Sequence, residues 1–274
     1  MNSGTALPAS RVYSDCGIPN ITGSATNPKL TQAGYKTTFR VIANDNALGA
    51  GVAEHAAASG IKNVAVVDDR TAYGQGIAQV FKKTARERGM QIVSEQFTTD
   101  KSADFTSILT AIKSRSPQAI FFGGIDAQLG PMLRQMEQLG MRDLVVYGGD
   151  GICSNKLPEL AAGSALVDQV RCAEGGVSLD RMPAGKAWKQ RYDARFAGQF
   201  QVFSPYTYDA TMVLVDAMVR AGSTDPAVYV KRLRDTRLDG ATARIEFGPD
   251  GDLKNPAMTL FRFRGGKKVA LNLP

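Results

Sequence analysis

Residues 64–67, Val-Ala-Val-Val, constrain the fold more than any other stretch of the chain. A short apolar run rich in β-branched residues predicts a strand that is buried on both faces, which is typical of a parallel sheet. Residues 74–88 follow with apolar side chains at helical spacing. Because open α/β sheets bind ligands beyond the carboxyl ends of their strands, the polar loop 68–73 is a candidate binding loop. Tyr73 can contact a ligand there or simply pack the turn.

The same alternation of strand and helix recurs along the chain and predicts a doubly wound parallel sheet. We expect strands at 18–21, 39–42, 91–93, 119–122, 143–147, 243–247, 258–264 and 268–271, and helices at 49–59, 104–114, 127–139, 182–200, 205–221 and 227–234. Tyr73, the pair Gly123-Gly124 and Asp150 each follow a predicted strand, so they should meet at one sheet edge. The negative charge of Asp150 suits a cationic group there, and the glycines permit close backbone approach.

Two hydroxyl-rich loops lie within the first thirty residues, at 2–5 and 22–28. Each can be an ordinary turn or helix cap. Together, hydroxyl groups and backbone donors suit an anionic group such as a carboxylate.

Composition excludes several classes of protein. The formal charge of +7 comes from 33 basic against 26 acidic residues, but the basic side chains are spread over predicted helix faces, so we expect no nucleic-acid partner. The apolar runs are far shorter than the roughly 20 residues of a membrane helix. The first residues lack the basic and apolar pattern of a secretory signal.

The cysteines and the single histidine predict neither a metal site nor a cofactor. Cys16, Cys153 and Cys172 show no Cys-x-x-Cys spacing, and His55 is expected at the surface or partly packed. Cys153 and Cys172 can form one disulfide in an oxidising compartment, which leaves Cys16 over. The run 49–54 does not fit a dinucleotide loop, because its sixth residue is a glutamate. The aromatic residues Trp188, Tyr192 and Phe196 are expected in the core.

With these loops in view, the chain resembles the periplasmic leucine/isoleucine/valine-binding proteins of ABC importers from end to end. The matching stretches include Ser-Ala-Thr-Asn-Pro at 24–28, Tyr-Gly-Gln-Gly at 73–76 and Phe-Gly-Pro-Asp-Gly-Asp at 247–252, with others at 8–10, 17–19, 38–40, 104–105, 123–124, 132–135 and 148–151.

The resemblance implies two α/β lobes joined by three crossings that close on the ligand like a hinge. One lobe would hold residues 1–43 and 177–254, and the other 44–176 and 255–274. Family members carry further strand-helix units before the segment that begins here, so we expect an incomplete first lobe. Its uncovered strand edges and apolar faces predict that the chain self-associates or rearranges its first lobe.

The resemblance also implies roles for single residues. Ser3 and Thr26, with the backbone of Ser24 or Ala25, match the positions that hold the carboxylate of the amino acid. Tyr73 and Asp150 match those that face its ammonium group, where the family usually has a glutamate. Ile125 replaces a residue that is often aromatic.

The expected function is therefore a periplasmic, non-enzymatic receptor for branched-chain or other apolar amino acids that delivers them to membrane permease subunits. The chain offers no nucleophile paired with a base. An alternative is a sensor of the same fold that binds amides or aromatic acids. An α/β enzyme is the third possibility.

Overall fold

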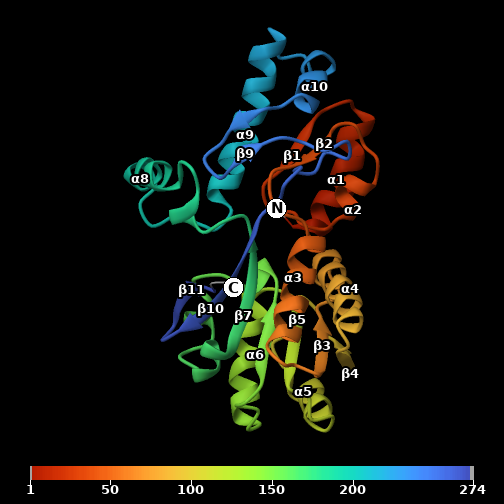
Figure 1. Cartoon of the computed structure of the whole chain (residues 1–274), viewed down its shortest axis with the longest axis vertical. Coiled ribbons are helices and arrows are strands. Elements are labelled where there is room, and N and C mark those ends of the chain that lie inside the picture. Colours follow the sequence, from red (N-terminus) through yellow and green to blue (C-terminus); the bar gives the residue numbers. More distant parts are fainter. Residues whose placement is uncertain (1, 272–274) are drawn as a thin grey trace. The chain divides into compact units, whose positions relative to one another are not determined.

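The computed structural model describes residues 2–271, which fall into two compact units. Unit 1 comprises Met1–Asn44 and Gly175–Ala257, and unit 2 comprises Asp45–Glu174 and Met258–Pro274. The chain therefore passes between the units three times, after Asn44, Glu174 and Ala257. Figure 1 shows how segments that lie far apart in the sequence combine within each unit.

Unit 2 is built on a seven-stranded sheet with the order β11-β10-β7-β6-β5-β3-β4. Four parallel pairings join β4 to β3, β3 to β5, β5 to β6 and β6 to β7, and β10 and β11 form an antiparallel hairpin. The strands are β3 (Asn63–Asp68), β4 (Gln91–Phe97), β5 (Ala119–Gly123), β6 (Val145–Gly148), β7 (Val170–Gly175), β10 (Met258–Arg264) and β11 (Lys267–Ala270). The helical segments are α3 (Asp45–Ala58), α4 (Ala72–Glu87), α5 (Thr106–Lys113), α6 (Asp126–Gln138), η1 (Asp150–Ile152), α7 (Leu157–Leu160) and η2 (Ala165–Gln169).

Strand β3 is buried on both faces, which confirms the prediction from its apolar run. Ala65 and Val67 point into the core formed with α5 and α6. On the opposite face α3 packs against α4, where Phe81 of α4 stacks on Phe121 of β5 with ring centroids 4.1 Å apart. Because helices cover both faces of the sheet, this strand has a continuous apolar run instead of alternating apolar and polar residues.

Unit 1 contains a two-stranded parallel sheet of β1 (Asn20–Thr22) and β2 (Thr38–Arg40), and an antiparallel pair of β8 (Leu238–Asp239) and β9 (Arg244–Ile245). Its helical segments are α1 (Ser3–Asp15), α2 (Lys29–Gln32), η3 (Leu179–Arg181), α8 (Gly185–Arg195), α9 (Ser204–Ala221) and α10 (Pro226–Arg234). The core joins Phe39 of β2 and the residues that follow it to the buried faces of α9 and α10.

Two predicted features of the fold were wrong in detail, and one strand was not predicted. The helix expected over 182–200 begins at Gly185, because Pro183 holds Met182 in an extended conformation. Its aromatic stripe is only partly core, since Trp188 is buried but Phe196 is 44% exposed. Strand β7 went unpredicted, because its sequence, Val-Arg-Cys-Ala-Glu-Gly, lacks an apolar run.

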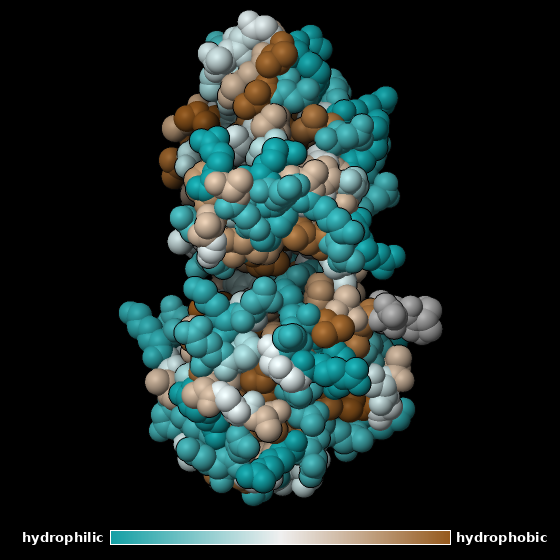
Figure 2. Space-filling model, turned by 90° about the vertical axis from the view of Figure 1, so that its left-hand side faces the viewer, coloured by the Kyte–Doolittle hydropathy of each residue, from teal (hydrophilic) through white to brown (hydrophobic). Residues whose placement is uncertain are grey.

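The surface is mostly hydrophilic on the face shown in Figure 2, where hydrophobic residues form small separate patches. Among the described residues, the structure contains no helix with the length and apolarity to cross a membrane.

Candidate functional site

The predicted site residues form two groups, one in each unit. We call Ser3, Ser24, Ala25 and Thr26 of unit 1 the hydroxyl cluster, and Tyr73 and Asp150 of unit 2 the Asp150 pair. Ile125 also belongs to unit 2.

The loop after β1 carries three of the four residues of the hydroxyl cluster. The side-chain oxygen of Thr22 accepts hydrogen bonds from the backbone N–H groups of Ser24, at 3.2 Å, and Ala25, at 2.8 Å. A threonine at the end of a strand bends the chain in this way because its hydroxyl replaces a backbone acceptor. Ala25 and Thr26 are consequently buried, and Ser24 is half-buried.

Arg40 of β2 supports this loop from beneath. Its fully buried guanidinium donates to the carbonyl oxygens of Ala25, at 3.0 Å, and Asn27, at 2.9 Å. The same group pairs with Asp252 at 2.7 Å. Sequence reasoning assigned Arg40 no role, although a charged residue within a predicted strand was the available signal.

Ser3 approaches the same loop from α1. It is 2% exposed, and its Oγ accepts the backbone N–H of Asn27 at 3.3 Å. The segment 2–5, expected as a loop before the helix, instead forms the start of α1, because Asn2 is the extended N-cap residue. The hydroxyl cluster therefore lies at a helix N-terminus, where outward-pointing N–H groups and the helix dipole favour an anion.

The Asp150 pair lies at the carboxyl ends of the strands of unit 2. Strand β3 pairs with β4 on one side and with β5 on the other, so the direction of winding reverses beside it. Tyr73 lies in the first turn of α4 after β3, Ile125 follows β5, and Asp150 follows β6. Ligands of open α/β sheets bind at such a reversal point.

Tyr73 and Asp150 are directly bonded. The tyrosine hydroxyl donates to Oδ1 of Asp150 at 2.8 Å and accepts the backbone N–H of Gly151 at 2.9 Å. Burial raises the pKa of Asp150 to about 6, although the Tyr73 hydrogen bond opposes this, and the negative charge of Glu174 adds to the rise. Burial and then the charge of Asp150 raise the pKa of Tyr73, so the phenol remains a donor at neutral pH.

Gly151 is required for this close approach. A Cβ atom at this position would lie 2.6 Å from the carbonyl oxygen of Gly124 and 2.8 Å from Cε1 of Tyr73. Because neither neighbour is the far end of a flexible side chain, any larger residue would displace the tyrosine ring.

A second set of residues lies beside Asp150, and sequence reasoning missed the ion pair within it. Lys268 of β11 forms an ion pair with the buried Glu174 of β7 and donates to the carbonyl oxygen of Cys153 at 3.0 Å. Cys153 forms a disulfide with Cys172 of β7, whereas Cys16 is free and exposed. Lys268 lies 118 residues from Asp150 in the sequence, so only the sheet order brings them near.

Ile125 presents an apolar surface at the end of β5. It is 41% exposed and precedes α6, where its backbone N–H donates to the side chain of Gln128 at 3.1 Å.

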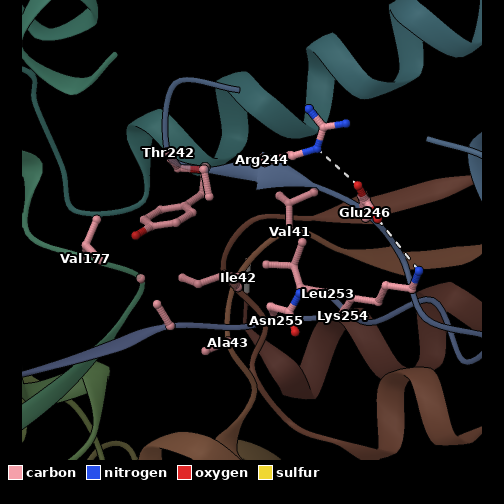
Figure 3. A pocket seen from close by; sticks show the side chains of 14 residues that line it. Val41, Ile42, Ala43, Val177, Thr242, Arg244, Glu246, Leu253, Lys254 and Asn255 are labelled. Atoms are coloured by element: carbon pink, nitrogen blue, oxygen red, sulfur yellow. Dashed lines mark hydrogen bonds and ion pairs between the residues drawn. The ribbon is translucent and has the colours of Figure 1, made fainter. Parts of the chain in front are cut away.

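Unit 1 also contains a cavity of about 310 Å³ (Figure 3). Apolar residues of the segments 41–43, 176–177 and 253–257 line much of it. Glu246, on its wall, pairs with Arg244 at 3.1 Å and with Lys254 at 3.7 Å, and these three side chains run along one side of the view. None of the predicted site residues lines this cavity.

A metal site and the single histidine were also considered in the sequence, and residues 2–271 show the following. These residues contain no group of three or more histidine, cysteine and acidic side chains that could hold a metal ion. His55 is half-buried, as expected, and its ring contacts Tyr147 with centroids 5.9 Å apart. Burial lowers its pKa.

The sheet order and the polar groups beyond its strands define an α/β protein of the ligand-binding type. A family model described as "Periplasmic binding protein" matches residues 1–268. The chain belongs to this family and has the type I periplasmic binding fold.

Named relatives agree with the family. A leucine-, isoleucine-, valine-, threonine- and alanine-binding protein of Pseudomonas aeruginosa is 30% identical over 262 residues, which cover 95% of this chain and 69% of that protein. Leu/Ile/Val-binding protein homolog 3 of Brucella melitensis is 30% identical over 274 residues, covering 99% and 73%. The structure of a leucine-binding protein, LivK, from Thermotoga maritima has a TM-score of 0.89 at 27% identity and covers 97% of this chain and 76% of that chain.

Proposed function

We propose that this protein is a periplasmic receptor for branched-chain or other apolar amino acids that feeds an ABC importer. The observation that carries the proposal is the chemical complementarity of its two polar groups. A helix N-terminus with hydroxyls suits a carboxylate, and a buried carboxyl with a phenol donor suits an ammonium group. An α-amino acid carries both charges.

Each residue then has a defined role. Ser3, Thr26 and the backbone of Ser24 or Ala25 receive the carboxylate, while Asp150 and Tyr73 receive the ammonium group. Ile125 contributes apolar surface to the ligand side chain. Asp150 is one methylene shorter than the glutamate usual in the family, so its reach to the ammonium group depends more on the position of its backbone.

The three chain passages between the units would act as a hinge that lets both groups contact one ligand. Such a receptor needs charge complementarity and closure rather than a nucleophile and base, so we infer no catalytic activity. The Cys153–Cys172 disulfide favours an oxidising compartment, in agreement with the periplasm. Membrane permease subunits would be the partners.

Thermal unfolding with leucine, isoleucine, valine, phenylalanine and glutamate tests the proposal. A ligand at about 100 times its Kd should stabilise the fold by roughly 2.7 kcal/mol. We expect stabilisation by the aliphatic amino acids. Stabilisation only by amides or aromatic acids would favour a sensor of the same fold, and no response to leucine, isoleucine or valine would contradict the proposal.

Two leucine analogues separate the roles of the two groups in calorimetric titrations. Leucinamide lacks the carboxylate, and 4-methylpentanoate lacks the ammonium group. Asp150→Asn should weaken leucine binding but leave 4-methylpentanoate unaffected, with Asp143→Asn as an exposed control just before β6. Ser3→Ala should weaken the binding of both leucine and 4-methylpentanoate, with Ser10→Ala as the buried control on α1. Equal losses in variant and control would refute the assigned role.

A further inference from the structure

The turn that carries Asp150 has little stiffness of its own. Gly149 and Gly151 flank the aspartate, and glycine restricts the backbone least of all residues. The turn, η1, is held internally by a long 3.4 Å bond from Ile152 N–H to the Gly149 carbonyl and a 3.1 Å bond from Cys153 N–H to the Asp150 carbonyl. Ile152 anchors its end in the core. Backbone N–H groups of Asp150 and Gly151 also bond to the carboxylate, and the remaining restraint on its direction comes from groups outside the turn.

Tyr73 restrains the turn from one side, through its bonds to Asp150 and Gly151. Cys153 restrains it from the other. This residue follows η1 directly, and its disulfide joins it to Cys172, whose Cα lies 5.5 Å away. Cys172 is paired in the sheet with Gly148, the last residue of β6. The disulfide therefore holds Cys153, which follows the turn, close to Gly148, which precedes it.

Lys268 adds a second tether to the same residue. It donates to the carbonyl oxygen of Cys153 at 3.0 Å while paired with Glu174, two residues beyond Cys172 in β7. Both cysteines and Glu174 are buried and Lys268 is half-buried, so the disulfide is shielded from bulk water and the Lys268 bonds are partly shielded.

We propose that the Cys153–Cys172 disulfide, assisted by Lys268, is a positioning element that aims the Asp150 carboxylate at the ammonium group of the ligand. This inference rests on the proposed function. A preorganised group binds more tightly than one that must first be ordered, and a supporting bond several residues away can supply that order. The disulfide itself does not touch the ligand.

Replacing both cysteines, Cys153→Ala with Cys172→Ala, tests the proposal by calorimetric titration at pH 7. We expect leucine to bind at least tenfold more weakly, and 4-methylpentanoate to change by less than twofold. In an Asp150→Asn background the same replacement should cause no further loss for leucine, because coupled residues are not additive. Cys16→Ser, at the free exposed cysteine, is the matched control and should bind normally.

Equal weakening of leucine and 4-methylpentanoate, or an additive loss with Asp150→Asn, would overturn the proposal, since either indicates a general structural effect. If the double variant does not fold by circular dichroism, Lys268→Gln removes only the second tether. It should weaken leucine about threefold, whereas Lys267→Gln, at the exposed neighbour in β11, should not. An unchanged affinity in Lys268→Gln would then count against the proposal.

A measurement without ligand separates this inference from the proposed function. The side-chain carboxyl of Asp150 can be titrated by carbon-13 NMR in wild type and in the double cysteine variant. We expect its titration to move toward that of an ordinary aspartate when the disulfide is lost, because the freed turn exposes the carboxyl to water. Failure of wild type to bind leucine would refute the proposed function alone, whereas an unchanged titration would refute the positioning role.

Discussion

Asp150 shows how a binding residue can lower the stability of the protein that carries it. Its folded-state pKa of about 6 exceeds the ordinary value of 3.8, so folding favours the protonated form. The corresponding stability is present below pH 3.8 and is lost as the pH rises through about 6. The ionised carboxylate should therefore cost up to about 3 kcal/mol above pH 7 when no ligand is bound.

Asp150→Asn should remove this cost while keeping an acceptor for Tyr73. We expect the variant to be more stable than wild type in urea unfolding at pH 8, by up to about 3 kcal/mol, with the difference vanishing near pH 4. Asp143→Asn is the control. Equal stabilities of wild type and Asp150→Asn at pH 8 would contradict this account.

Leucine affinity should increase when Asp150 ionises, whereas stability decreases. An ammonium group favours the ionised carboxylate, so below the pKa of about 6 that Asp150 has in the folded protein without ligand, binding must first remove its proton. We expect Kd to be constant between pH 7 and 8 and about tenfold higher at pH 5. Calorimetric titrations across this range provide the measurement, and a flat profile would rule out Asp150 as the ammonium partner.

At the scale of the element, the loop after β1 depends on a side chain from another strand. Arg40 of β2 satisfies the carbonyls of Ala25 and Asn27 and is itself neutralised by Asp252. Arg40→Ala would remove the buried donor that these carbonyl oxygens share and the cation that neutralises Asp252. We expect a loss of about 3–5 kcal/mol in the free energy of unfolding. Arg244→Ala, which breaks only exposed ion pairs, should have little effect, and similar losses in both would argue against this role.

The elements that sequence could predict are those with a strong local signal. The buried run of β3 and the spacing of α4 identified strand, loop and helix, and parallel topology then indicated that Tyr73 and Asp150 follow strands of one sheet. Strand β7 was not predicted because its residues are buried by their neighbours and form no apolar run of their own. The roles of Lys268 and Arg40 were not predicted for a related reason. Their partners lie far away in the sequence, and no local pattern records a contact of that range.

At the scale of the whole molecule, the proposed function predicts that the radius of gyration changes when the ligand binds. If they close on a ligand, small-angle X-ray scattering should give a smaller radius of gyration with saturating leucine than without it. Asp150→Asn, which should not hold the ammonium group, is the control and should respond less at the same leucine concentration. An identical scattering curve with and without leucine, at a concentration shown by calorimetry to saturate wild type, would exclude closure.

The discontinuous composition of the units has a consequence for synthesis on the ribosome. Residues 45–174 emerge while unit 1 still lacks 175–257, and β10 and β11 follow only after unit 1 is finished. During translation, Glu174 is therefore buried next to β6 without Lys268, or it stays in water until the hairpin arrives. Docking of this hairpin is thus a late folding step. A nascent chain halted before residue 258 should hold Glu174 without its compensating cation, and would be a favoured substrate for chaperones.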